Sequence, residues 1–180
     1  MDSRPYTKLY SIILISSFLF NGCSSEAPEL IQEEELITTV KLTFKSSEET
    51  QIVRWNTLTT NSEIIQLKAN SMYEVAIEFL DDSDPVDIKN ITTEVIEEAN
   101  DHQVFYEFSG VNVIYGTSDS DVLDDNQNPL YINSIWNFVE SSSGVVRIYL
   151  IHEPTSKNSS NRSGFGGETD IQVDIPLHIN

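Results

Sequence analysis

Apolar and polar residues alternate with a period of two through most of the chain after about residue 35. The clearest cases are the segments 36–44 (LITTVKLTF) and 72–80 (MYEVAIEFL), in which every second side chain falls on one face. This spacing predicts strands with one buried face. Further strands are expected at 51–55, 64–67, 103–108, 112–115, 131–139, 145–152 and 171–179. Eight or nine strands joined by short turns predict a mostly β fold, an antiparallel, immunoglobulin-like β-sandwich.

One segment has helical rather than strand spacing. In 87–101 the apolar residues Ile88, Ile91, Val95 and Ala99 recur at intervals of three and four. This pattern predicts a single short helix inserted near 88–101, with Asn90 or Asp87 as its N-cap. The other face of this helix carries acidic side chains, among them Glu94 and Glu97.

The first 22 residues have the pattern of a signal peptide. Arg4 and Lys8 precede an apolar run over 9–20, and about a dozen residues span only about 18 Å as a helix, too short to cross a bilayer. The run ends at Phe20-Asn21-Gly22-Cys23, which resembles the lipobox of bacterial lipoproteins. The resemblance implies cleavage before Cys23 and lipidation of its thiol.

The segment after the cysteine is acidic and poor in large apolar residues. Residues 23–34 include Pro28 and four glutamates, a composition that favours a flexible tether. We therefore expect a signal peptide at 1–22, a lipidated tether at 23–34 and one β-sandwich domain at 35–180, a length that suits one domain.

The charge balance excludes one class of partner. The chain has 29 acidic and 10 basic residues, for a formal net charge of -19, so it lacks the basic clusters that bind nucleic acid. The single cysteine excludes an internal disulfide and a cysteine-built zinc site.

Two groups of residues are candidate cation sites. The first combines imidazoles with carboxylates, which suits zinc, manganese or nickel better than calcium. His102 follows the acidic helix face, and the other members flank the end of one strand and the start of the last: Glu98, Asp101, His102, His152, Glu168 and Asp170. In a sandwich these residues could meet at one end; the alternative is a solvated acidic face with no ligand.

The second group lies in the loop TSDSDVLDDNQNP. Oxygen ligands at close spacing are what calcium requires, and this loop offers Asp119, Asp121, Asp124, Asp125 and Asn126. It lacks the glycine and the twelfth-position glutamate of an EF-hand, so a hairpin turn without metal is the alternative. The glycine-rich loop 155–167 is expected to be mobile, and its distinctive side chains are Arg162 and Phe165.

Three further stretches resemble a family of uncharacterised Bacteroidota lipoproteins. They are ELITTV at 35–40, EEANDHQ at 97–103 with the residues through Tyr106, and HEP at 152–154 together with GGETD at 166–170. Members are commonly labelled type 1 periplasmic binding fold superfamily proteins, a label that implies two α/β lobes, whereas the strand pattern here predicts a β-sandwich. The resemblance implies an outer-membrane lipoprotein, with the membrane face left open and a TonB-dependent receptor as a candidate partner.

These observations predict a binding module rather than an enzyme. We expect a lipid-anchored accessory protein of the cell envelope that holds a ligand, with a divalent cation as the candidate cofactor. The alternative is a structural or adhesive surface domain that contacts protein or glycan without a small ligand. No catalytic residue is predicted, because the sequence has neither a Gly-x-Ser-x-Gly nucleophile motif nor a His-Glu-x-x-His motif.

Overall fold

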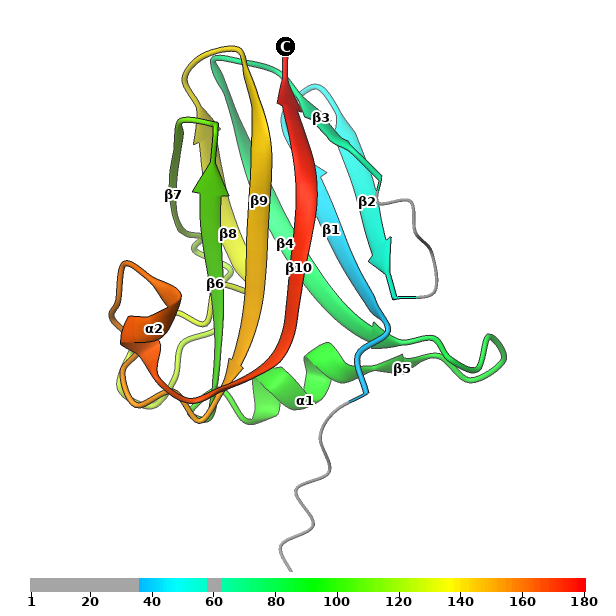
Figure 1. Ribbon diagram of the computed structural model, residues 1–180, viewed down its shortest axis with the longest axis vertical. Helices are drawn as coiled ribbons and strands as arrows, with labels where there is room; N and C mark the ends of the chain where they lie inside the picture. The colour runs from blue at the N-terminus through cyan, green and yellow to red at the C-terminus, as the bar shows by residue number, and fades with distance from the viewer. Residues whose placement is uncertain (1–35, 58–62) are drawn as a thin grey trace, which may run out of the picture. The chain divides into compact units, whose positions relative to one another are not determined.

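The computed structural model describes residues 36–57 and 63–180 and forms two packed β-sheets (Figure 1). Sheet A has the order β2-β1-β4-β8-β7, with β5 paired to β4, and sheet B has the order β3-β10-β9-β6. The strands of sheet A are β1 (Thr39–Lys45), β2 (Thr50–Asn56), β4 (Ser71–Asp81), β5 (Lys89–Asn90), β7 (Val113–Thr117) and β8 (Asn133–Phe138). Those of sheet B are β3 (Ile65–Leu67), β6 (His102–Ser109), β9 (Ser142–His152) and β10 (Glu168–Ile179). The predicted β-sandwich is confirmed. The predicted signal peptide, Cys23 and the predicted tether lie outside the described residues.

The alternating pattern places one face of each long strand in the core. Val40, Leu42 and Phe44 of β1 are completely buried, and β1 is hydrogen-bonded along its length to both β2 and β4. At the centre lies Trp136, whose ring centroid is 5.5 Å from that of Phe44 in the same sheet and 4.8 Å from that of Phe108 in the other. The core therefore joins the two sheets through aromatic side chains.

One strand pairing departs from the antiparallel expectation. β3 pairs with β10 in the parallel sense, with Ile65 opposite Leu177 and Leu67 opposite Ile179. The chain leaves sheet A after β2, adds β3 to the edge of sheet B and returns to sheet A as β4. Neighbouring strands in the sequence thus belong to different sheets, which period-two spacing does not reveal.

The inserted helix is shorter than predicted. α1 spans Ile91–Glu97, and the turn after it continues to Asp101. Residues Lys89–Asn90 are extended because they pair with the end of β4, and the Asn90 side chain accepts a hydrogen bond from the Thr92 N–H as the N-cap. Ile88, expected on the buried stripe, is therefore exposed, whereas Ile91, Val95 and Ala99 are buried.

α1 lies across one end of the sandwich, where β6 and β10 begin and β9 ends (Figure 1). The Thr92 hydroxyl accepts a hydrogen bond from the Phe79 N–H and donates one to the Phe79 carbonyl, which fastens the helix to β4. Among the described residues no helix has both the length and the apolar character that crossing a membrane requires.

The loop after β9, expected to be mobile, is folded against the outer face of sheet B. Its single-turn helix α2 (Arg162–Phe165) places Phe165, which is 3% exposed, against Phe105, Tyr149 and Ile151. Arg162 donates hydrogen bonds to the carbonyl oxygens of residues 166, 167 and 168. The side chains of Arg162 and Phe165 therefore both stabilise the folded conformation of this loop.

Candidate metal site

Strand register brings two histidines together at the end of the sandwich covered by α1. His102, the first residue of β6, lies directly opposite His152, the last residue of β9. Their imidazole rings are stacked, with centroids 4.9 Å apart and an angle of 7° between the planes. The neighbouring His152 is one of the causes that lower the pKa of His102.

A carboxylate from the third strand completes the group. The register of β10 against β9 shifts between Thr169 and Ile171, and Asp170 is the extra residue at this bulge. Asp170 Oδ2 is 3.8 Å from His102 Nε2, and Asp170 Oδ1 is 3.7 Å from His152 Nδ1. The three ligand atoms that His102, His152 and Asp170 offer lie within 4.8 Å of one another, and we call these residues the His-Asp cluster.

The surroundings of His102 favour the protonation state that binds metal. His102 is 1% exposed, and its Nδ1 is 3.2 Å from the Glu98 carbonyl oxygen. A carbonyl only accepts, so this contact favours the tautomer with the proton on Nδ1, in which Nε2, on the side of Asp170, could ligate an ion. Burial lowers the pKa of His102 below its ordinary value, against the opposing effect of the Glu98 carbonyl. Burial therefore favours the neutral ring over the protonated one.

The donor set of the His-Asp cluster suits a transition metal ion. Two imidazole nitrogens and one carboxylate are common ligands of zinc and leave a further position open. Ligands in a tetrahedral zinc site with bonds of about 2.05 Å lie about 3.3 Å apart, so the separations of 3.7 and 3.8 Å would contract by about 0.4–0.5 Å on binding. Because the three ligand atoms are within 4.8 Å rather than 3.3 Å of one another, binding would require the two imidazoles as well as Asp170 to move toward a common point.

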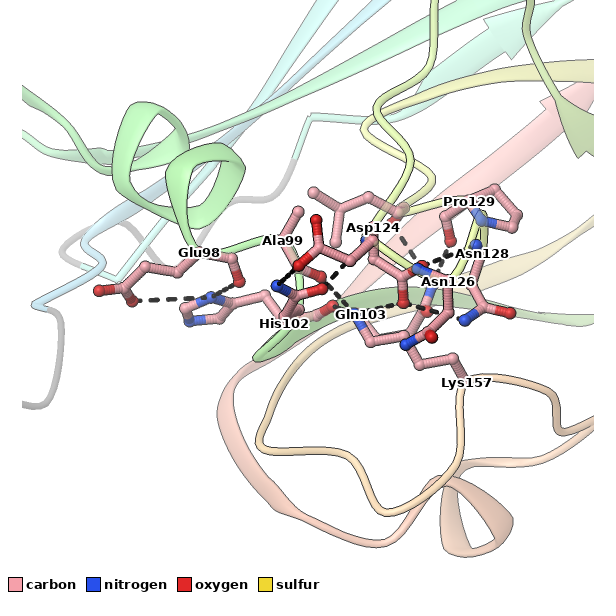
Figure 2. Close-up of polar contacts among 12 residues, drawn as sticks. Glu98, Ala99, His102, Gln103, Asp124, Asn126, Asn128, Pro129 and Lys157 are labelled. Atoms are coloured by element: carbon pink, nitrogen blue, oxygen red, sulfur yellow. Dashed lines mark hydrogen bonds and ion pairs between the residues drawn. The ribbon is translucent and has the colours of Figure 1, made fainter.

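The remaining candidates of the first group lie beside the cluster rather than in it. Glu98 Oε2 is 4.0 Å from His102 Nδ1, on the opposite edge of the ring from Asp170, so Glu98 is placed to orient the imidazole instead of holding the ion (Figure 2). Glu168 lies opposite His152 in the sheet, and Asp101 accepts a hydrogen bond from the Glu153 N–H through its carbonyl. The side chains of Glu168 and Asp101 are exposed, and neither belongs to the cluster.

The loop predicted for calcium uses its carboxylates as hydrogen-bond acceptors. Asp121 accepts from the N–H groups of Tyr131 and Asn133, and Asp125 accepts from the Asn100 side chain. Asp124 is buried and accepts from the N–H groups of residues 126 and 128 and from the Asn128 amide (Figure 2).

The structure gives the acidic residues of this loop a role without a metal. Burial raises the pKa of Asp124, but the hydrogen bonds from Asn128 and Asn126 outweigh it, and the net pKa lies below its usual value. Asp119 and the Asn126 side chain are exposed. Within the described residues, the His-Asp cluster is the one group of three His, Cys, Asp or Glu side chains placed to hold an ion, so calcium binding stays a prediction.

Lys157, which no sequence pattern singles out, connects the two candidate regions. Its Nζ donates hydrogen bonds to the carbonyl oxygens of Ala99 and His102, the latter at 2.7 Å, and lies 3.6 Å from Asp124 Oδ2 (Figure 2). Its side chain is 9% exposed, and burial lowers the pKa of Lys157 against the opposing effect of Asp124. The local sequence SKNSS has no pattern that distinguishes this lysine. Its one distinguishing feature in the sequence is that basic residues are few, ten against 29 acidic ones.

Comparisons with protein-family models, with curated proteins and with solved structures gave no match to this chain.

Proposed function

We propose that this chain is a lipid-anchored module of the cell envelope that binds a divalent transition metal ion, with zinc as the reference ion. The observation that carries the metal half of the proposal is the His-Asp cluster, in which a neutral, oriented imidazole and a second imidazole face one carboxylate. Three donors from three strands form a site with an open position, which allows an ion to exchange or to bind a further ligand.

The charge of the chain supports the same conclusion. A net charge of -19 attracts cations and raises their concentration near the surface. Calcium and magnesium share this attraction, but they prefer oxygen ligands, so the two imidazoles of the cluster select against them.

The anchor half of the proposal comes from the sequence. The Phe20–Cys23 segment resembles a lipobox, and acyl chains on Cys23 would contribute about 0.8 kcal/mol per buried methylene, enough for stable attachment. Mass spectrometry of the mature protein tests this half: we expect an acylated N-terminal Cys23, and a free thiol would contradict it. An outer-membrane location and docking on a TonB-dependent receptor extend this proposal, and capture of such a receptor with the tagged protein is its test.

Metal binding is tested with the full-length chain in detergent micelles after treatment with EDTA. Isothermal titration with Zn²⁺ is expected to show one saturable site, and Ca²⁺ at the same concentrations is expected not to compete. His152→Ala and Asp170→Asn should abolish the site while leaving the core intact, because both side chains lie at the end of the sandwich.

His178→Ala is the matched control. His178 is the remaining histidine; it lies near the far end of β10, exposed, with Nδ1 2.7 Å from the Ser143 hydroxyl. This variant should bind Zn²⁺ like the wild type. Equal zinc binding by the wild type and by the His152→Ala, Asp170→Asn double variant would refute the site, and no saturable binding at all would favour the structural or adhesive alternative.

A further inference from the structure

The loop between β9 and β10 begins and ends at ligands of the His-Asp cluster. It leaves β9 directly after His152 and returns to β10 just before Asp170. Its two ends lie close together: a Cβ on Gly167 would be 2.2 Å from the His152 carbonyl oxygen, and Gly167 has φ +62. Only glycine fits this crossing without strain. An ion held by His152 and Asp170 would therefore join the two ends of the loop.

The same loop also contacts the third ligand, His102, through Lys157. The Lys157 ammonium donates to the His102 carbonyl at 2.7 Å and to the Ala99 carbonyl, so it holds the backbone that carries the buried imidazole. The imidazole is fixed to the same segment at its other edge, by the Glu98 carbonyl. Lys157 thus sets the position of the segment from which His102 Nε2 points toward Asp170.

The surroundings of the Lys157 ammonium favour a positive charge. The last carbonyl oxygens of a helix carry partial negative charge, and α1 ends among the acidic residues Glu97, Glu98 and Asp101. The described part of α1 has no basic residue in its last turn. The Lys157 ammonium lies just beyond the helix, on the carbonyl oxygens of Ala99 in the following turn and of His102 at the start of β6, and Asp124, 3.6 Å away and almost completely buried, holds the ammonium in place from the other side.

We propose that Lys157 is a positioning residue of the metal site, which couples the folding of the 153–167 loop to metal binding. This inference rests on the proposed function. Metal ligands are oriented by outer contacts, and loss of such a contact typically weakens binding about ten- to a hundredfold. Lys157 differs from an ordinary outer contact because it acts through the backbone of His102 rather than through the imidazole.

The test uses Co²⁺, whose visible spectrum reports coordination geometry, with the full-length chain in detergent. Lys157→Met is expected to bind Co²⁺ about tenfold more weakly than the wild type and with altered visible bands, because His102 is displaced. Lys68→Met is the matched control: Lys68 is 53% exposed and pairs with Glu48 on the surface, and its loss should change neither affinity nor spectrum. In the wild type, Zn²⁺ should slow amide exchange across residues 153–161, and in Lys157→Met this protection should be lost.

The outcomes separate this inference from the proposed function. If the wild type binds no Co²⁺, the proposed function fails and the inference with it. If Lys157→Met is folded and binds Co²⁺ with the affinity and spectrum of the wild type, Lys157 is a structural residue only and the inference alone is refuted. If Lys157→Met does not fold, Asp124→Asn replaces it: a severalfold weaker, spectrally altered Co²⁺ complex supports the coupling, and an unchanged complex refutes it.

Discussion

Removal of the Phe165 ring should detach the loop that carries α2 without unfolding the sandwich. Phe165 is 3% exposed, and its ring centroid lies 5.0 Å from that of Phe105 in a small cluster that also contains Tyr149 and Ile151. This cluster is separate from the main core. A Phe to Ala change in a core costs about 3–5 kcal/mol, and the small size of this cluster favours the lower end, about 3 kcal/mol.

That free energy should appear mainly as local opening. Phe165 is the one buried hydrophobic side chain that the loop contributes, so the loop can open while both sheets stay packed. A loss of about 3 kcal/mol in opening free energy corresponds to roughly a hundredfold faster amide exchange in residues 153–167. Global stability in urea, measured by far-UV circular dichroism, should fall by less.

The assay is hydrogen exchange of Phe165→Ala measured by mass spectrometry, with Phe165→Leu as the control. Leucine keeps an apolar side chain in the cluster, so its exchange rates should rise much less, by about tenfold or less. Unchanged exchange in residues 153–167 of Phe165→Ala would refute the view that this side chain anchors the loop. A full 3 kcal/mol loss in global stability with no extra local exchange would show that the loop and the sheets unfold together.

Three further changes test the fold. Trp136→Ala should destabilise the protein by about 3–5 kcal/mol in urea unfolding, because this completely buried side chain joins the two sheets; a loss below 1 kcal/mol would contradict that role. Hydrogen bonds, the first from the Thr38 hydroxyl, lower the pKa of Asp82 below its ordinary 3.8, so its contribution to stability is present above that pH and is lost as the pH falls further. In urea unfolding at pH 7, Asp82→Asn should therefore have a lower free energy of unfolding than the wild type. This difference in free energy should become smaller below pH 4, and a difference that does not change with pH would refute the role of Asp82. Gly167→Ala should lower the melting temperature, because its Cβ would lie 2.2 Å from a backbone carbonyl oxygen at positive φ, whereas Gly116→Ala, which meets open space, should not; equal effects would contradict the crossing geometry.

Much of the sandwich was predictable because each strand buries one face. The period-two pattern located every long strand, from β1, where Val40 and Leu42 alternate with polar residues, to β10. Helical spacing located α1 but overestimated its length, because pairing of Lys89 and Asn90 with β4 keeps these residues extended. Pairing with a distant strand thus decides the conformation of these two residues, and the sequence of their own segment does not show that pairing.

The sequence predicts which types of residue form the candidate site, but not which of the six candidate residues lie together in it. Six residues were named from the chemistry of imidazoles and carboxylates, and the structure brings three of these together. His102 and His152 are opposite each other because of the β6–β9 register, and Asp170 joins them because of a bulge. Register and bulges depend on long-range pairing, so neither follows from the spacing of residues along the chain.

The segments that connect the strands at one end of the sandwich determine the surroundings of the His-Asp cluster. His102 and His152 lie at the ends of their strands, where a sheet alone does not bury or orient a side chain. The turn after α1 covers His102 and supplies the Glu98 carbonyl, while the loop after His152 supplies Lys157 to the same turn. Burial and an oriented proton, which a metal ligand needs, therefore come from the two segments that connect the strands rather than from the strands themselves.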